Sequence, residues 1–583
     1  MKKHLFRYFL LLSALLACTE IFSQNVYNLK IIVNNKDQKA ILKKYSYKKE
    51  FKDTLSRKEE LNDLLYTLWQ DGYMAASIDS LIKDSITILA YLNIGEKYLW
   101  VNLKKGNVEN ALLQEAGYKE KTFSGKPVDY RDVVKLNEKI IKYCENNGYP
   151  FASVRLDSIA FSDSSLLASI HLSKNGKVEI DSVVMRGKAR LAMVYLQNYL
   201  NIKSGDLYDE SKVSVISIKI KELQFLREIR PFNIIFNNTK AKIVIYADKK
   251  KNSQFDGVLG VLPNSQTTGN LMLTGEANLS LINSFYRGEM IDINWRKLQQ
   301  NTQDLKMGFV YPYLLNTPFG ADIKFKLYKN DTLYINIERN LGVRYIFTGN
   351  NYIKAFVENH TSSLISTSQY KYATKLPAYS DVSSTMYGLE YKMQKLDYLL
   401  NPRKGFDIKI TGSAGNKHIK KNPDLNEELY EGIKINSTQY KLGGMLSYYI
   451  PVIAKSTIKL GMDAAALQSE NMFENELFRI GGLKSLRGFD EEVITASFYN
   501  IATIEYRFLF EQNSYLFAFW NGAYYESRTV NKFIHDTPYG FGAGVCFETK
   551  AGIFSLSYAL GKQFNNPIYF KSAKIHFGIV NYF

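Results

Sequence analysis

The sequence predicts a chain in two parts: three small α+β domains, then a sixteen-stranded antiparallel transmembrane β-barrel. Three observations predict this fold. The first 250 residues repeat a pattern of helices and strands, the later residues alternate apolar and polar side chains, and no long apolar run follows the N-terminal segment. A spanning helix needs about 20 consecutive apolar residues. Any membrane crossing by the mature chain is therefore expected to use strands.

Composition agrees with a large β protein. Aromatic residues make up 14% of the 583 residues, yet the mean hydropathy is only -0.23. This combination is typical of a soluble β protein or of a transmembrane barrel, whose strands are apolar on one face and whose rims carry aromatic girdles. The net charge of +18 fits a solvated basic surface, or contact with anionic lipid or acidic peptides. Nucleic acid is not an expected partner, because no basic cluster is interleaved with stacking aromatics.

The N-terminus has the pattern of a secretory signal peptide, predicted over residues 1–23. Basic residues precede an apolar run, as in exported proteins. Two cleavage sites fit. Cleavage between Ser23 and Gln24 suits an ordinary signal peptidase and is preferred, whereas the residues before Cys18 resemble a lipobox, in which Cys18 would be lipidated. In both cases the chain is expected to be exported.

The first 250 residues contain an internal repeat. Gly72-Tyr73 returns as Gly148-Tyr149, 76 residues later, and each copy follows an amphipathic helix. The apolar faces of these helices consist of Leu61, Leu64, Leu65 and Leu68, and of Val133, Leu136, Ile140 and Cys144. Strand patterns follow at residues 86–94 and 166–172. A third unit, without the Gly-Tyr motif, covers about residues 177 to 250. The order of strand, two helices and two strands predicts α+β repeat domains.

The rest of the chain predicts a barrel. From about Ser253, apolar and polar residues alternate. An example is Ile291, Ile293 and Trp295 between Asp292, Asn294 and Arg296. Turn residues divide this region into about eleven strands before Glu470 and five after Ser497, an even total, as in bacterial single-chain barrels. From a periplasmic start, the long connections near residues 366–379, 418–434 and 471–495 fall outside. A soluble β-sandwich is the alternative.

A glycine-rich motif lies in the outer connection after the eleventh strand. It consists of Gly481, Gly482, Ser485, Leu486, Arg487, Gly488 and Phe489. Glycines allow the backbone to turn sharply. A guanidinium group, with five donors and a permanent charge, can bind acceptors on a barrel wall, and it would be costly to bury alone. The alternative is an ordinary glycine-rich surface loop.

These motifs resemble the superfamily of outer-membrane assembly and translocation barrels that contains BamA, TamA and the two-partner secretion transporters. The repeats resemble polypeptide-transport-associated (POTRA) domains. The Arg487 loop resembles the loop-six motif of the superfamily, which folds back into the lumen. Residues 401–406 resemble its Pro-Arg-x-Gly turn, and residues 540–545 with 552–558 resemble its penultimate hairpin. The resemblance covers nearly the whole mature chain.

The resemblance implies that Arg487 is a structural latch on the inner wall of late strands and not a catalytic residue. The matching segment of the thirteenth strand contains Phe519 and Asn521. Asn521 stands where the family often has an acid, so its contact with Arg487 would be a hydrogen bond rather than an ion pair. The last strand, with Gly578 and the terminal Phe583, resembles the C-terminal signal by which barrels are recognised.

The implied domains are a signal peptide at 1–23, POTRA-like domains at 26–95, 96–176 and 177–250, and the barrel at 251–583. This layout is most similar to TamA. The implied function is assembly or insertion of outer-membrane proteins. POTRA domains in the periplasm would bind unfolded outer-membrane or secreted clients, since a small sheet can accept an extended chain at its edge. The first and last barrel strands would open and template client strands. The lipid bilayer and an accessory periplasmic or inner-membrane protein are the further partners.

Three other functions are the alternatives to assembly of outer-membrane proteins. A two-partner-type secretion pore, exporting one dedicated protein, is the alternative; it would predict an N-terminal plug helix, for which the sequence after Gln24 leaves little room. A passive porin does not account for three periplasmic domains. The six histidines are scattered and no nucleophile or metal-ligand motif is present, so neither catalysis nor a cofactor is expected; a barrel lipase is the enzymatic alternative. Cys144 and Cys546 lie far apart, which disfavours a disulfide framework.

Overall fold

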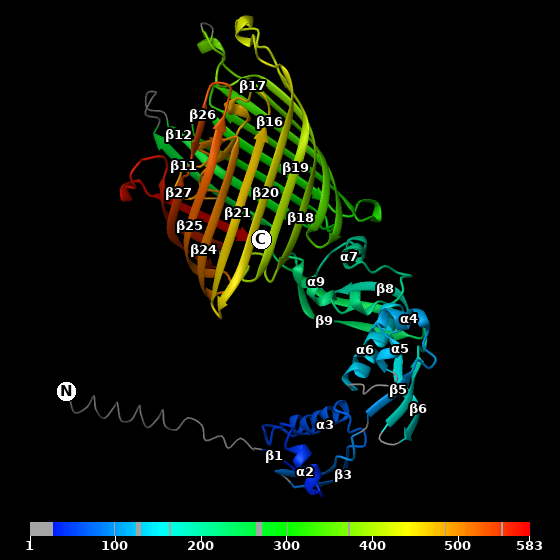
Figure 1. The fold of residues 1–583 in the computed structure, drawn as a ribbon. Coiled ribbons are helices and arrows are strands. Elements are labelled where there is room, and N and C mark those ends of the chain that lie inside the picture. The colour runs from blue at the N-terminus through cyan, green and yellow to red at the C-terminus, as the bar shows by residue number, and fades with distance from the viewer. Residues whose placement is uncertain are drawn as a thin grey trace, which may run out of the picture. The chain divides into compact units, whose positions relative to one another are not determined.

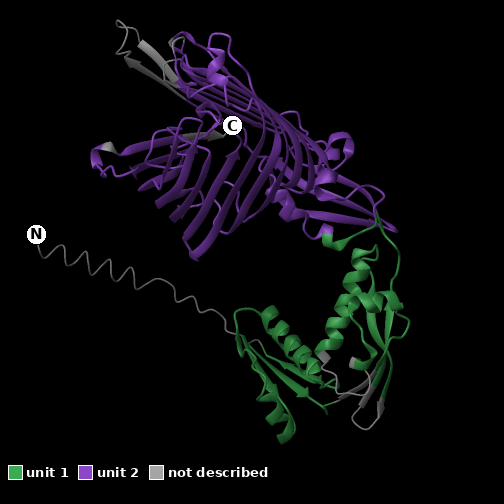
Figure 2. Cartoon of the chain, turned by 45° about the horizontal axis from the view of Figure 1, so that its top comes forward, with its two compact units in different colours: residues 1–179, 207–211 green, residues 180–206, 212–583 purple. Residues whose placement is uncertain are grey.

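The structure, a computed structural model, describes residues 27–84, 86–97, 99–123, 130–162, 165–263, 271–299, 301–370, 373–483, 485–549 and 552–582. The predicted signal peptide with Cys18, and the terminal Phe583, lie outside these described residues. Two compact units make up the chain, residues 1–179 with 207–211 and residues 180–206 with 212–583 (Figure 2). None of the described helices is both long enough and apolar enough to cross a membrane.

The first unit begins with a four-stranded sheet. Its elements are β1 (Tyr27–Ile32), α2 (Lys36–Leu42), β2 (Glu50–Phe51), α3 (Thr54–Gln70), β3 (Ser77–Lys83) and β4 (Thr87–Asn93). The strand order is β2-β1-β4-β3, with β1 and β4 parallel. The side chain of Asp53 caps α3 by accepting a hydrogen bond from the backbone N–H of Ser56. The four leucines predicted to form the apolar face of this helix are all buried.

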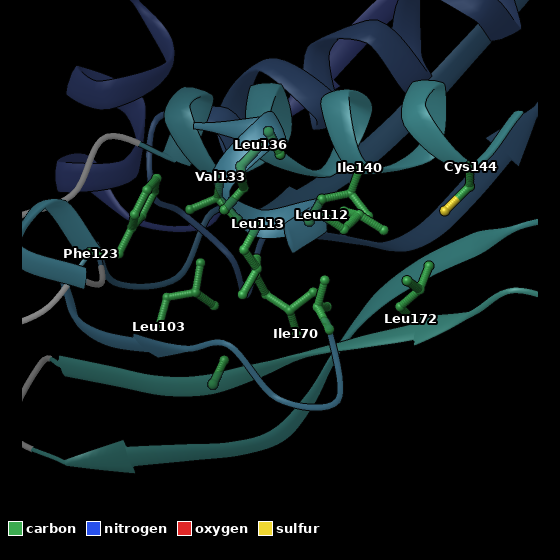
Figure 3. Packing of buried hydrophobic residues seen from close by; sticks show 13 residues of the cluster. Leu103, Leu112, Leu113, Phe123, Val133, Leu136, Ile140, Cys144, Ile170 and Leu172 are labelled. Atoms are coloured by element: carbon green, nitrogen blue, oxygen red, sulfur yellow. The ribbon is translucent and has the colours of Figure 1, made fainter. Parts of the chain in front are cut away.

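A second sheet in the same unit repeats this plan. Its elements are β5 (Leu99–Lys104), α4 (Asn110–Ala116), α5 (Glu120–Phe123), α6 (Tyr130–Asn146), β6 (Ser153–Ser162) and β7 (Ser165–Ser173), in the strand order β5-β7-β6. The predicted face of α6 is buried, and it packs over Ile170 and Leu172 of the sheet (Figure 3). Apolar burial on this scale is the main source of stability for so small a domain.

The third sheet has the order β8-β10-β9. Its elements are β8 (Glu179–Arg186), α7 (Met193–Leu200), α8 (Glu210–Val213), α9 (Ile216–Glu222), β9 (Leu226–Asn237) and β10 (Lys240–Lys249). Leu196, Leu200 and Ile220 from the helices are fully buried, as is Ile243 of the sheet. Three successive α+β sheets therefore precede the barrel, which confirms this half of the predicted fold class.

The remaining strands form one closed antiparallel barrel (Figure 1). Before the long loop they are β11 (Gln254–Pro263), β12 (Leu271–Ile282), β13 (Met290–Gln299), β14 (Thr302–Tyr311), β15 (Phe319–Asn330), β16 (Tyr334–Thr348), β17 (Asn351–Leu364), β18 (Val382–Leu396), β19 (Gly405–Ile419), β20 (Asn436–Ile453) and β21 (Ser456–Gln468). After it they are β24 (Phe498–Glu511), β25 (Ser514–Arg528), β26 (Phe533–Asp536), β27 (Tyr539–Thr549), β28 (Gly552–Lys562) and β29 (Lys574–Tyr582).

These segments make sixteen strands, because β26 and β27 are two parts of one strand. Both pair with β25 in a single register, Tyr525 opposite Asp536 and Gly522 opposite Tyr539. The break falls at Pro538, which has no N–H to donate to the ladder, although its carbonyl still accepts from Ala523 at 2.8 Å. The barrel thus has eleven strands before the long loop and five after it, as predicted.

Side chains alternate between the lipid face and the lumen. In β18, Tyr387 and Leu389 are 64% and 59% exposed on the outside, while Met386 and Glu390 are 2% and 5% exposed inside. Polar and charged side chains can occupy the lumen because they find partners there, whereas the outer face must be apolar to meet lipid. The fold class predicted from alternation is confirmed.

The long connections pack together at one end of the barrel. Three of them follow odd-numbered strands, so they leave the same rim. Apolar side chains of these connections and of the adjoining strand ends form a cluster of Leu376, Val382, Ile419, Leu425, Tyr430 and Phe473. Backbone hydrogen bonds join separate loops, from Glu474 to the Ala378 carbonyl at 2.9 Å and from Val530 to the Met472 carbonyl at 2.9 Å. The loops are held as one packed layer over this rim.

Candidate functional site: loop six and the barrel seam

Loop six, here residues 469–497, connects β21 to β24 and packs against the inner barrel wall. A short hairpin of β22 (Phe478–Ile480) and β23 (Ile494–Ala496) closes its base. An apolar cluster joins the loop to the wall strands β24 and β25 and consists of Ile480, Leu486, Phe489, Ile494, Ala496, Ile501, Ala523 and Tyr525. Leu486, singled out in the sequence, is fully buried. The motif is therefore part of a packed core inside the barrel.

Arg487 contacts three wall residues. Its Nη1 lies 2.6 Å from Oε2 of Glu505 on β24, and its Nε donates to Oδ1 of Asn521 on β25 at 2.9 Å. The guanidinium carbon also lies 3.5 Å from the centroid of the Phe519 ring, in cation–π geometry. The Asn521 amide in turn donates to Thr503 Oγ1 at 2.6 Å, which fixes its orientation. The structure thus places Asn521 and Phe519 around Arg487.

Glu505 is the acidic partner that sequence reasoning missed. One carboxylate oxygen binds Arg487 and the other accepts from Nε of Arg507 at 2.8 Å. All three side chains are at most 10% exposed, so the two ion pairs are largely removed from water. The ion pair that position 521 cannot make is therefore supplied from the neighbouring strand. The sequence did contain one indication of this ion pair. Glu505 and Arg507 are charged residues two positions apart, on the inward face of a predicted strand.

Arg507 connects this cluster to a turn at the other rim. Its Nη1 donates to Oδ1 of Asn401 at 2.8 Å, and the Asn401 amide donates to the carbonyl of Gln512 at 2.9 Å. Asn401 begins the turn before β19 that the sequence singled out for its Pro-Arg-x-Gly pattern. A continuous chain of hydrogen bonds therefore runs from Arg487 through Glu505 and Arg507 to Asn401.

Glycines in the penultimate hairpin create the seat for the tip of loop six. A Cβ atom at Gly540 of β27 would lie 1.9 Å from the Arg487 carbonyl oxygen. At Gly561 of β28 it would lie 2.6 Å from the Gly488 carbonyl oxygen. Real side chains do not approach so closely, so the wall must be bare backbone here. The bare backbone of the hairpin and the tip of loop six therefore pack directly against each other.

The glycine pair at the start of the motif shapes the rest of the loop. Gly482 has a φ of +91°, and a Cβ there would lie 2.1 Å from the carboxylate carbon of Glu491. That carboxylate accepts a hydrogen bond from the backbone N–H of Leu483 at 2.8 Å. Ser485 Oγ accepts from the N–H of Gly481 at 2.9 Å. The loop therefore folds back on itself, with Glu491 held under the glycines.

Loop six also carries an acidic arm, Glu491 and Glu492, that reaches the early strands. Glu492 Oε1 lies 2.5 Å from Nη2 of Arg296 on β13, and Glu491 Oε2 lies 3.5 Å from Nη1 of the same residue. Lys306 on β14 lies 3.7 Å from Glu492. Burial opposes ionisation of Glu492, but Arg296 and Lys306 outweigh it and hold the pKa of Glu492 below its usual value.

The seam, where β11 meets β29, has the fewest paired positions of the barrel junctions among the described residues. Among the described residues it has two paired positions, Gln254 opposite Tyr582 and Phe255 opposite Asn581. On its other edge, β29 pairs with β28 from Val580 back to Lys574. Gly578 lies on β29, where a Cβ would approach Ser555 no closer than 4.0 Å, so no close contact requires a glycine there.

The described residues contain no group of three or more potential metal ligands among His, Cys, Asp and Glu. Cys144 on α6 and Cys546 on β27 are buried free thiols. The contacts of Arg487, Glu491 and Glu492 with the wall are ion pairs and hydrogen bonds that hold loop six in place.

Three α+β domains, a sixteen-stranded barrel and an arginine loop bound to its inner wall define the class of outer-membrane barrels with POTRA domains. A family model described as the Omp85 superfamily domain matches residues 283–583, slightly more than half of the chain. The chain belongs to the Omp85 superfamily. Its barrel lies in the outer membrane and its POTRA domains in the periplasm. Members of this superfamily are membrane insertion and transport proteins that act with client proteins. No curated protein sequence matches this chain.

Several solved structures are similar to it. CdiB from Escherichia coli matches with 12% identity and a TM-score of 0.55, over 91% of this chain and 98% of that one. CdiB from Acinetobacter baumannii matches with 12% identity and a TM-score of 0.51, over 90% and 97%. BamA from Haemophilus ducreyi lacking POTRA domains 1–3 matches with 15% identity and a TM-score of 0.44, over 83% and 100%. The two CdiB matches show a shared fold.

Proposed function

We propose that this protein assembles client β-barrels into the outer membrane. Its POTRA domains bind the unfolded client, and the barrel seam opens to template the client's strands. The observation that carries this proposal is the seam, which has two paired positions among the described residues. Strand edges beyond these pairs offer backbone N–H and C=O groups to an incoming strand.

The membrane makes such a seam significant. Backbone groups without partners are costly in lipid, so a barrel normally pairs every strand along its length. Separation of two strands costs the least free energy at a junction with few backbone hydrogen bonds. A client strand that pairs with the opened edge satisfies the same groups, and the exchange can proceed with little net loss of hydrogen bonds.

A secretion pore that exports one dedicated protein is the second candidate. The lumen beside loop six contains a cavity of about 540 Å³, lined by charged residues that include Lys324, Lys409 and Glu390. An extended polar chain could pass such a surface. However, loop six occupies the lumen through buried ion pairs, so passage would require that these contacts break.

Depletion of the protein in its native host separates the two candidates. If it is an assembly factor, the levels of several outer-membrane barrels should fall together when its synthesis is stopped. Quantitative mass spectrometry of outer-membrane fractions measures this. Unchanged barrels together with the loss of one secreted protein would contradict the assembly function and favour the pore. Re-expression of the wild-type gene is the control.

The proposal extends to the domain limits, the role of Arg487, the binding partners and the C-terminal signal. Domain limits at 26–95, 96–176, 177–250 and 251–583 fit the repeat pattern, and the similarity in layout to TamA stays a prediction. Arg487 and its motif act as a structural latch, without a catalytic role or a cofactor. Unfolded clients bind the POTRA domains, and an accessory periplasmic or inner-membrane protein is a further partner. Gly578 and Phe583 belong to the signal that directs assembly of this barrel.

A further inference from the structure

Loop six is attached to the barrel on both sides of the seam. On the side of the late strands, its tip is seated against Gly540 of β27 and Gly561 of β28. On the side of the early strands, Glu491 and Glu492 bind Arg296 of β13. In the closed sheet the order is β28-β29-β11-β12-β13, so the seam lies between these two attachments. The loop therefore spans the seam from within the lumen.

The early-strand attachment is concentrated on Arg296. This guanidinium contacts Glu492 at 2.5 Å, Glu491 at 3.5 Å and Asp304 of β14 at 3.1 Å. The Arg296 side chain is 14% exposed and that of Asp304 is 3% exposed. Ion pairs in such partly buried surroundings are screened less by water and salt than ion pairs on a surface. By contrast, the pair of Asp490 with Lys574 of β29 is well exposed and contributes little.

The backbone at Glu492 has an uncommon conformation for a residue with a side chain. Glu492 has a φ of 55°, a left-handed conformation that residues other than glycine rarely adopt. Such strain persists only where surrounding contacts over-determine the conformation. Here the contacts are the Arg296 ion pair and the Arg479 guanidinium, which donates to the Glu492 carbonyl at 3.4 Å.

We infer that the acidic arm of loop six, bound to Arg296, is an internal brace that holds the seam closed. Arg296 is the positioning residue of this brace. Because the described residues of the β11–β29 junction pair at only two positions, a link from β13 to the late strands affects whether the two edges stay together. The inference rests on the proposed function, since it names the device that controls the opening on which strand exchange depends.

The charges explain how removal of Arg296 would release the seam. Without its guanidinium, Asp304, Glu491 and Glu492 remain close together, and Lys306 still pairs with Asp304 and Glu492. The like charges repel one another, and the ion pair with Arg296 no longer holds the arm in its left-handed conformation. The tip stays seated on β27 and β28, but the loop no longer connects to β13.

Amide hydrogen exchange of the full-length protein in lipid nanodiscs tests this inference. In the Arg296→Gln variant, we expect the amides of β11 and β29 to exchange on the order of tenfold faster, because local opening exposes them. The amides of β18 to β20, on the far wall, should exchange as in the wild type. Arg296→Lys, which keeps the charge, should restore most of the protection.

Two further variants keep the test decisive. The double variant Glu491→Gln/Glu492→Gln removes the arm and should reproduce the seam effect, and combining it with Arg296→Gln should add nothing further. Lys441→Gln is the matched control, because it breaks another lumen ion pair, to Glu358 at 2.7 Å, that joins β17 and β20 away from the seam. It should leave β11 and β29 unchanged.

The outcomes separate this inference from the proposed function. Unchanged seam exchange in the arm and Arg296 variants would overturn the inference, as would a uniform rise in all strands, which indicates general destabilisation. If the seam opens faster but client assembly does not respond, the brace stands and the assembly function falls. If the seam is unchanged but assembly still requires it to open, the brace falls and the assembly function stands.

Discussion

Replacing Glu505 with glutamine is expected to destabilise the barrel by about 3–5 kcal/mol, the typical cost of leaving buried charges without a partner. Glu505 is the only acid that contacts Arg487 and Arg507 among the described residues, and both arginines are nearly buried. The variant keeps the shape of the side chain but removes the charge. Urea unfolding in lipid vesicles, followed by tryptophan fluorescence, measures the change.

Asn521→Asp provides the comparison for this variant. Asn521 Oδ1 already accepts from Arg487 at 2.9 Å, so an aspartate there places a second carboxylate on the same guanidinium. We expect the single variant to be at least as stable as the wild type and to recover part of the loss in a Glu505→Gln background. A Glu505→Gln protein that unfolds at the wild-type urea concentration would contradict the role given to this ion pair.

Gly540→Ala is the second large effect, and it is steric. The added Cβ would lie 1.9 Å from the Arg487 carbonyl oxygen, so the tip of loop six must leave its seat. We expect amide exchange in residues 485–489 to rise on the order of a hundredfold, because their protection depends on this packing. The hydrogen bonds and cation–π contact of Arg487 should be lost with it.

Gly443→Ala is the matched control for the steric effect. Gly443 also lies in a barrel strand and faces the lumen cavity, but a Cβ there meets nothing within 4 Å. It should therefore leave loop six unchanged. Equal exchange in the two variants would show that the tip does not depend on a bare backbone at position 540.

Much of this architecture could be predicted because it depends on local pattern. Alternation of apolar and polar residues located the strands, and the position of the motif after the eleventh strand located loop six. The helix faces with Leu68 and Ile140 followed from a period of 3.6 residues. The strand interrupted at Pro538 pairs with β25 in one register on both sides of the break. The predicted number of sixteen strands is therefore correct.

Contacts between distant strands could not be predicted in the same way. Alternation shows that Glu505 and Arg296 face the lumen, but it does not show which of the lumen charges a loop will reach. That depends on strand register and on how far the loop folds inward. The family pattern directed attention to Asn521, while the acid lay on the adjacent strand. The brace joins Arg296 to Glu492, 196 positions later in the sequence, so local pattern does not reveal it.

The proposed function depends on separation of β11 from β29, so a disulfide across the seam tests it most directly. Cysteines replace Phe255 and Asn581, which are opposite in the register. The measurement is the rate at which a purified client barrel folds into vesicles that contain the oxidised protein. A control pair replaces Ile323 and Leu341, which are opposite in β15 and β16. We predict that the oxidised seam variant loses its activity and regains it with reductant, while the control pair is unaffected. Equal client folding with the seam oxidised and reduced would contradict a function that depends on separation of β11 from β29.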